Sequence, residues 1–285
     1  PTANPSASDH AATPPPVVVS SLGGRMTLIT GLGGNIVLLG GSDGALVIDS
    51  GVPEAAEKTL ATARKGGPIS LLVNTHWHYD HVGGNEVFAE SGARTLASAN
   101  CRKRMSVEQN MEALEMKVPA SAPRALPNVT FEQETMLHLN EDDIRLVPVA
   151  PAHTDGDVFV HFAKADVIHA GDLFFNGMFP FIDWSSGGWI GGMSAGVRSL
   201  VELAGPKTRI VPGHGPLAKT EDLKNYLGFL ETMQERFEKE KAAGKSVDEV
   251  VAAAPVEKFE EKLGHGFLKG EQFVRITYTG LLKHA

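Results

Sequence analysis

The feature that most constrains this chain is a run of potential metal ligands, NTHWHYDHVGGN at residues 74–85, which follows an apolar stretch. His76 and His78 are two residues apart, so in an extended segment both imidazoles point to the same side. Asp80 and His81 follow where the chain must turn, just before two glycines. Four ligands this close together would crowd one tetrahedral ion, so they fit two neighbouring metal sites better. The fold therefore has to bring further ligands to this segment.

The apolar stretch at residues 69–75, which leads into this run, is nearly continuous, and such stretches are typical of a buried strand. Other short apolar runs bounded by Gly, Asn, Asp and Ser predict further strands. These runs cover residues 26–30, 35–40, 45–51, 130–139, 144–150, 157–163, 165–171 and 209–213. Helices are expected at 53–67, 100–118, 221–244 and 271–284. The alternation of strands with helices predicts one α/β domain.

Three more ligand-type residues each follow one of the predicted strands. His153 follows 144–150, Asp172 follows 165–171, and His214 follows 209–213. Open α/β sheets place their sites at the carboxyl ends of their strands, so all these residues are expected at one edge. Three histidines can hold one ion, an aspartate with two histidines can hold another, and one carboxylate can bridge them. Two ions that share an oxygen are a known hydrolytic arrangement.

Five segments resemble, in the same order, the motifs of the metallo-β-lactamase-fold hydrolases: VIDSG, THWHYDHVGGN, PAHTDGD, GDLFF and PGHG. The resemblance runs from about Leu22 to His214 and implies an α/β fold, a four-layer αβ/βα sandwich. It also implies two bound Zn²⁺ ions, with iron or manganese as alternatives. The resemblance assigns His76, His78 and His153 to the first metal, Asp80, His81 and His214 to the second, Asp172 to the bridge, and Asp49 to bracing the ligand loop.

The chemistry implied by the resemblance is hydrolysis of a small substrate, such as a lactone, ester, thioester or lactam, whose carbonyl is attacked by a metal-bridging hydroxide. Asp80 is predicted to be catalytic, because it could orient the nucleophile and pass its proton to the leaving group. The β-lactamases of the superfamily usually have Cys or Ser where this chain has Asp172, so β-lactam hydrolysis is expected at most as a side activity. The other alternative is an iron-dependent oxidoreductase similar to the persulfide dioxygenases, which resemble this ligand set.

Aromatic residues in the segment 173–193, which follows Asp172, favour an apolar substrate pocket beside the metals. The alternative is that this stretch only packs over the core. The candidate pocket residues are Phe174, Phe175, Phe179, Phe181, Trp184 and Trp189. A second candidate wall is the segment 23–35, which could fold over the site as a flap.

Composition narrows the classes of partner. The formal net charge is −8 and there is no dense Lys/Arg tract, so a small molecule is the expected partner rather than a nucleic acid. No apolar stretch is long enough to span a bilayer. Residues 1–20, rich in Pro, Ala, Ser and Thr, are predicted to be a flexible leader before a hydrolase domain at 21–285 that includes the C-terminal helices. Such a leader favours a periplasmic or secreted protein, with a cytoplasmic one as the alternative, and the oligomeric state is left open.

Overall fold

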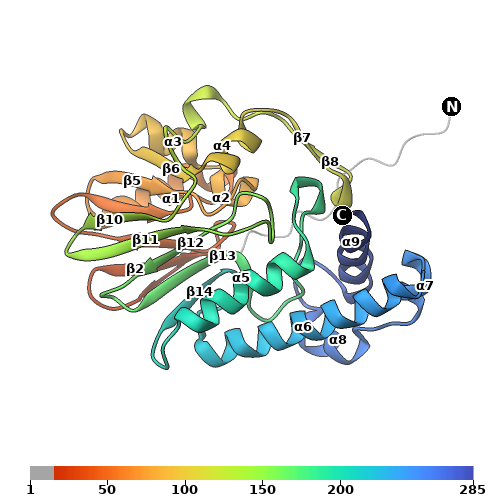
Figure 1. The fold of residues 1–285 in the computed structure, drawn as a ribbon. Helices are drawn as coiled ribbons and strands as arrows, with labels where there is room; N and C mark the ends of the chain where they lie inside the picture. The colour runs from red at the N-terminus through yellow and green to blue at the C-terminus, as the bar shows by residue number, and fades with distance from the viewer. Residues whose placement is uncertain (1–15, 285) are drawn as a thin grey trace.

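A computed structural model describes residues 16–284, which form two sheets packed face to face with helices on both outer sides (Figure 1). The first sheet contains, in spatial order, β1 (Val18–Ser21), β2 (Met26–Thr30), β3 (Ile36–Leu39), β4 (Ala45–Ile48), β5 (Ile69–Val73), β6 (Arg94–Ser98) and β9 (Val129–Phe131). Strands β1 to β4 pair antiparallel, whereas β4, β5, β6 and β9 pair parallel. This mixed order is the α/β architecture predicted from the sequence.

The connections between the parallel strands carry the first layer of helices. They are η1 (Pro53–Ala55), α1 (Ala56–Ala63), η2 (Arg64–Gly66), α2 (Tyr79–Val82), α3 (Asn85–Glu90), α4 (Ala99–Met105) and η4 (Pro123–Ala125). Leu60 of α1 and Phe88 of α3 are buried together with Val47 of β4, so these helices cover the outer face of the first sheet.

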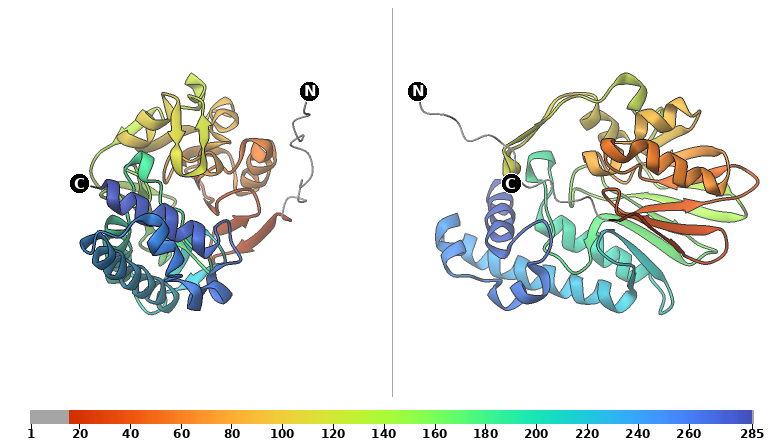
Figure 2. Two further views of the ribbon diagram at one scale, coloured as in Figure 1. Left: turned by 90° about the vertical axis from the view of Figure 1, so that its right-hand side faces the viewer. Right: turned by 180° about the vertical axis from the view of Figure 1, so that it is seen from behind.

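The second sheet contains β10 (Thr135–Leu139), β11 (Asp142–Pro148), β12 (Val158–Phe162), β13 (Val167–Phe175), β14 (Arg209–His214) and β15 (Ala218–Lys219), in this order. Only β13 and β14 are parallel neighbours in it. Helices α5 (Ile190–Leu203) and α6 (Thr220–Ala242) lie along its outer face. Beyond the ends of the strands, η5 (Trp184–Ser186), α7 (Val247–Ala252) and α8 (Glu257–Leu263) pack around α9 (Gly270–Lys283), as the views in Figure 2 show.

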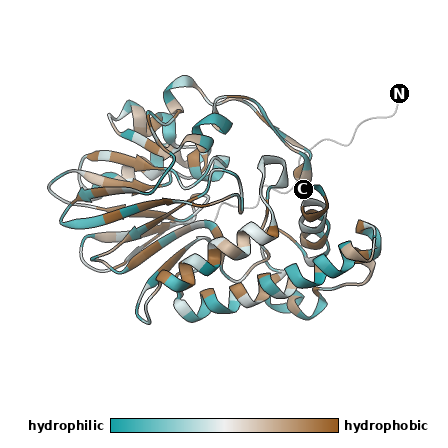
Figure 3. Cartoon of the chain, in the orientation of Figure 1, coloured by the Kyte–Doolittle hydropathy of each residue, from teal (hydrophilic) through white to brown (hydrophobic). Residues whose placement is uncertain are grey.

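Apolar strand residues fill the space between the sheets. Val37 and Leu46 of the first sheet are buried in one cluster with Leu146 and Val160 of the second. The strands are accordingly mostly brown in Figure 3, whereas α6 has a hydrophilic outer side. Helix α6 buries Leu223, Leu230 and Met233 at helical spacing, whereas none of its charged residues is buried. Within residues 16–284, no helix is both long and apolar enough to span a bilayer.

Three of the differences from the predicted boundaries change an element or its place in the fold. Residues 18–20, predicted as part of the leader, lie in β1 and pair with β2, whereas residues 1–15 lie outside the described residues. The predicted strand 130–139 is two strands, β9 and β10, because the chain crosses there from one sheet to the other. The predicted helix 100–118 is wrong beyond Met105, where α4 ends.

In place of that helix, β7 (Gln109–Met111) and β8 (Met116–Val118) form a hairpin closed by η3 (Glu112–Leu114). The hairpin reaches from the α4 side of the molecule to the C-terminal helices (Figures 1 and 2). At its tip Glu112 Oε2 lies 3.1 Å from Lys283 Nζ of α9. Both side chains are exposed, so this ion pair contributes at most about 1 kcal/mol. Apolar packing therefore has to fix most of the hairpin's position.

Candidate metal centre

The predicted ligand residues lie on segments that end at one edge of the two sheets. His76 and His78 are in the loop after β5, and His81 is in the short helix α2 that follows. His153 is in the loop between β11 and β12, and His214 is the last residue of β14. Asp172 was expected just after a strand, but β13 continues past it to Phe175. A bulge at Gly171, where φ is +53°, interrupts the pairing of β13 with β14 next to Asp172.

The seven residues form two adjoining groups. In one group are His76, His78, His153 and Asp172, and in the other are Asp80, His81 and His214. Within each group the potential ligand atoms lie within 4.8 Å of one another. Asp172 lies between the groups, with Oδ2 3.9 Å from His76 Nε2 and 3.4 Å from His214 Nε2. The fold thus brings together every residue that the sequence predicted as a ligand.

Hydrogen bonds on the outer side of the rings select the nitrogens that face inward. His153 Nδ1 lies 2.7 Å from the carbonyl oxygen of Phe181, to which it must donate. His78 Nε2 lies 3.2 Å from Asp183 Oδ2 and can donate to it in the same way. These bonds leave His153 Nε2 and His78 Nδ1 facing each other, 2.9 Å apart. Such outer partners are what orients metal-ligating histidines.

Asp49 connects the first ligand loop to α2. Its Oδ1 accepts from the Thr75 backbone N–H at 2.8 Å, and its Oδ2 lies 2.8 Å from both Thr75 Oγ1 and His81 Nδ1. Thr75 Oγ1 in turn lies 3.0 Å from His76 Nδ1. The backbone of Asp49 is left-handed, with φ +64°, and this conformation is rare for a residue other than glycine. Asp49 therefore holds two ligand rings with their Nε2 atoms turned inward.

The buried polar atoms at the centre fit a bound cation. Among residues 16–284, nothing donates to or accepts from His76 Nε2, although it is buried. His81 Nε2 and His214 Nε2 lie 3.3 Å apart, and two ring nitrogens can share only one proton. An ion held by imidazole nitrogens and carboxylate oxygens would satisfy all these atoms, and this donor set suits zinc and related divalent metals.

The charges at the centre favour the same conclusion. Burial lowers the pKa of His214, but Asp172 and Asp80 outweigh it and raise that pKa to about 9. Burial also opposes charge on His81, yet Asp172 and Asp80 raise its pKa well above the usual value. The carboxylates thus attract positive charge into the second group, and a metal ion could supply it as a proton does. In the first group burial lowers the pKa of His153 to about 4, so this ring is neutral and able to coordinate.

Two glycines allow the backbone to approach the ligands closely. A Cβ at Gly213 would lie 1.9 Å from Asp172 Oδ1, and one at Gly34 would lie 2.2 Å from the His81 ring. The Asn35 side chain donates to the carbonyl oxygens of Pro212 and Gly215, both at 2.9 Å. The segment 23–35 was a candidate flap, but it contains β2 and the turn fixed by these bonds. It therefore buttresses the ligands instead of folding over them.

Asp183 is a site residue that the sequence reasoning missed. It is fully buried, it contacts His78, and it accepts hydrogen bonds from Ser185 and Ser186. Its backbone N–H also donates to the His153 carbonyl oxygen at 3.0 Å. The available signal was the sequence DWSS, since Asp followed by Ser two residues later favours a local turn closed by the carboxylate.

Replacing Asp183 by Asn is expected to weaken metal binding about 10- to 100-fold, because His78 loses its charged outer partner. Competition with a chromophoric chelator measures this affinity directly. The matched control is Asp248→Asn, which removes an exposed carboxylate that pairs with Arg275. Equal affinity of the Asp183→Asn variant and the control would show that the contact does not position His78.

A cavity of about 410 Å³ opens beside both ligand groups. Its lining includes His78, Asp80, Asp172 and His214, so it gives direct access to the centre. Of the predicted pocket residues, Phe175 and Phe181 line this cavity. The Phe175 ring stacks on His214 with centroids 5.4 Å apart.

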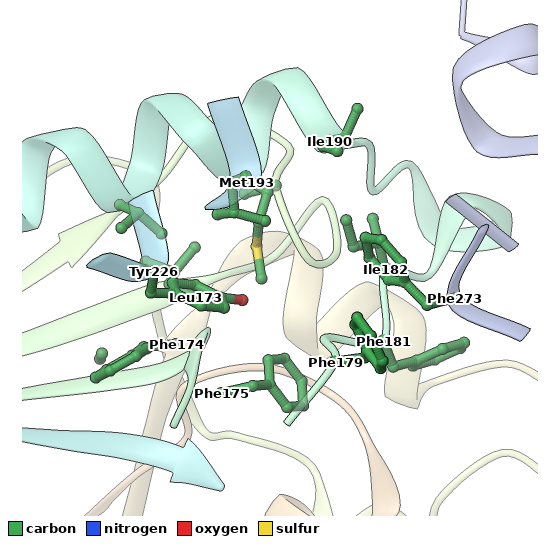
Figure 4. Close-up of a cluster of buried hydrophobic side chains, with 14 of the residues drawn as sticks. Leu173, Phe174, Phe175, Phe179, Phe181, Ile182, Ile190, Met193, Tyr226 and Phe273 are labelled. Atoms are coloured by element: carbon green, nitrogen blue, oxygen red, sulfur yellow. The ribbon is translucent and has the colours of Figure 1, made fainter. Parts of the chain in front are cut away.

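The other predicted pocket residues have packing roles. Phe174 turns away from its neighbour Phe175 and packs on Tyr226, with ring centroids 5.0 Å apart (Figure 4). Phe179 stacks on Phe273 of α9 at 5.2 Å. Trp184 lies under the Lys283 ammonium at 3.8 Å, and Trp189 stacks on His284 at 3.8 Å. Phe174 thus joins α6 to the second sheet, whereas the other three pack against α9 or His284 directly after it. None of the four lines the cavity.

The remaining wall of the cavity comes from segments that the sequence did not suggest. Met111, Leu114 and Met116 are contributed by the β7–β8 hairpin. Tyr79, Met178 and Phe267 complete the lining. The hairpin was missed because residues 106–118 were interpreted as helix.

Comparisons with known proteins agree with this architecture. The sequence model of the metallo-beta-lactamase superfamily matches residues 29–215. Hydroxyacylglutathione hydrolase of Polaromonas sp. (strain JS666 / ATCC BAA-500) is 34% identical over 120 residues, which cover 41% of this chain and 44% of that protein. Acyl-coenzyme A thioesterase MBLAC2 of Gallus gallus is 26% identical over 169 residues, which cover 54% of this chain and 60% of that protein. The chain thus spans about half the length of these relatives.

Solved structures show the same fold. A metallo-beta-lactamase from Pontibacter korlensis superposes with a TM-score of 0.62 at 20% identity, covering 76% of this chain and 99% of that one. The sec-alkylsulfatase Pisa1 from Pseudomonas sp. superposes with a TM-score of 0.68 at 15% identity, covering 94% of this chain and 51% of that one. At these identities the likeness concerns the fold alone.

Proposed function

The chain belongs to the metallo-β-lactamase superfamily, and from this premise we propose that it is a dinuclear zinc-dependent hydrolase of small carbonyl substrates. Lactones, esters, thioesters and lactams are the candidate substrates. The observation that carries the proposal is that Asp172 lies between two groups of inward-facing ligand atoms. The relatives named as a hydroxyacylglutathione hydrolase and an acyl-coenzyme A thioesterase support the same reaction class.

We assign the metals to the two groups. His76, His78 and His153 would hold one ion, Asp80, His81 and His214 the other, and Asp172 both. When bound, a pair of divalent ions supplies an activated water near neutral pH and polarises the carbonyl oxygen under attack. The hydrogen bonds that Asp49, Asp183 and the Phe181 carbonyl accept from the ring N–H groups would keep the ligand rings oriented before substrate arrives.

Asp80 is the proposed proton-transfer residue. Its carboxylate lines the cavity, is partly exposed, and lies 3.2 Å from His214 Nε2. Burial would raise the pKa of Asp80, but His81 and His214 outweigh it and hold this pKa below the ordinary range. Asp80 is therefore ionised at neutral pH, and its Oδ atoms can accept a proton from the attacking water and pass it to the leaving group.

Replacing Asp80 by Asn is expected to lower kcat about 10²- to 10⁴-fold, because the amide cannot accept that proton. The experiment is a screen of metal-replete protein against lactones, thioesters, esters, β-lactams and phosphodiesters. The control variant is Glu90→Gln, which removes an exposed carboxylate from α3. Metal content is measured in parallel, so that a loss of ions is distinguished from a loss of proton transfer.

One outcome would overturn the proposed function, and another would overturn only the role of Asp80. Stoichiometric iron with oxygen uptake, and no hydrolysis, would favour the oxidoreductase alternative. Unchanged kcat and unchanged metal content in the Asp80→Asn variant would remove Asp80 from the mechanism.

A further inference from the structure

The cavity beside the centre is apolar except at its base. Outside the four ligand residues, its lining consists of Tyr79, three methionines, one leucine and three phenylalanines. No Lys or Arg belongs to the lining. Substrate parts that extend away from the reacting carbonyl therefore meet apolar side chains and find no cationic partner there.

From this lining we infer that the substrate is an ester or thioester with a flexible, uncharged, apolar acyl chain, which the cavity holds next to the centre. The inference rests on the proposed function and specifies its substrate class. The residues that would contact the chain are Met111, Leu114, Met116, Met178 and Phe267.

The β7–β8 hairpin is built to present an apolar face to this cavity. Met111 and Met116 are directly opposite in its register, so their side chains lie on the same face. The neighbouring pair Asn110 and Lys117 is exposed, as expected for the opposite face. Leu114, at the η3 turn, extends the apolar face to the tip.

The residue types favour a flexible chain over a rigid ring. Three of the eight methionines of the protein line this one cavity. Methionine is unbranched and polarisable, so its side chain adapts to ligands of varying shape. At the cavity mouth Phe267 is 68% exposed and Tyr79 is 48% exposed. These aromatic side chains are not buried in the core, and an entering acyl chain would cover them.

The test measures kcat/KM of metal-replete protein on p-nitrophenyl esters and N-acetylcysteamine thioesters with acyl chains of increasing length. We expect kcat/KM to rise about fourfold per added methylene until the cavity is filled. Matched substrates that end in a carboxylate should react at least about tenfold more slowly, because the buried charge has no partner.

Met116→Lys probes the wall itself, since Lys has a similar unbranched shape but carries a cation. This variant should lose at least about tenfold in kcat/KM for the octanoyl substrate and should gain activity on the substrate of equal length that ends in a carboxylate. Met116→Leu should keep the wild-type profile, and Lys117→Met is the control on the exposed face. Metal content and Tm show that each variant is folded and loaded.

The outcomes separate the two proposals. Hydrolysis with no dependence on chain length, or an unchanged profile in Met116→Lys, would overturn the acyl-chain inference and leave the hydrolase intact. No hydrolysis of any ester, thioester, lactone or lactam by metal-replete protein would overturn the proposed function, and the inference with it.

Discussion

Replacing Asp172 by Asn is expected to lower kcat/KM at least about a hundredfold and to reduce the bound metal below two ions per chain. Loss of an outer partner of a ligand already weakens metal binding or activity about 10- to 100-fold, and Asp172 reaches both ligand groups directly. Its Oδ1 is also 3.2 Å from His81 Nε2. An amide keeps the shape of the side chain but removes the charge that offsets two cations.

Elemental analysis and steady-state kinetics on the same preparation check this prediction. Asp143→Asn is the matched control, because that carboxylate is exposed and pairs with His138 away from the centre. An Asp172→Asn variant with two ions per chain and wild-type kcat/KM would contradict the bridging role.

Removing the metals from the wild-type protein is expected to abolish hydrolysis and to lower Tm by about 10 °C. At free metal about 1,000-fold above Kd, binding contributes about 4 kcal/mol to the stability of the folded state. In a domain of this size that free energy corresponds to a shift of about this many degrees. Without ions, the ligand rings and carboxylates remain buried, and only protons are left to neutralise Asp172 and Asp80.

Thermal unfolding and activity assays before and after dialysis against a chelator measure both effects. Restoring Zn²⁺ should restore activity and Tm, which excludes irreversible damage. Full activity at less than about one tenth of an ion per chain would contradict a reaction that depends on the metal.

The clustering of the candidate ligand residues could be predicted from the sequence because its signal is local. His76 and His78 follow a buried apolar run, His153 follows β11, and His214 ends β14 at the same edge. Most strands were also predictable, and β2 was predicted with its observed bounds. A buried strand bounded by glycine turns is specified almost entirely by neighbours in the chain.

The hairpin could not be predicted, because its residues favour a helix when considered alone. The stretch from Gln109 to Val118 is rich in Glu, Met, Ala and Leu, and its turn has Glu115 at φ +50° in place of Gly or Asn. The observed conformation buries Met111, with Met116 and Leu114 half-buried beside it. Tertiary packing thus overrides local propensity here, and the largest error concerns a wall of the cavity beside the candidate metal centre.

Only some of the predicted pocket residues line the cavity, and the reason is geometric. Successive residues of a strand point to opposite faces, so Phe174 and Phe175 could not both line one cavity. Which of the two does so depends on the bulge at Gly171, and the composition of the aromatic stretch contains no sign of it.

The candidate ligands come from both halves of the sandwich: His76, His78, Asp80 and His81 follow β5 of the first sheet, and His153, Asp172 and His214 belong to the second. An ion bound at this edge would therefore link the two sheets to each other. A low concentration of the metal would then weaken the contact between the two sheets and also stop the reaction. The amount of folded protein would therefore depend on the supply of the ion.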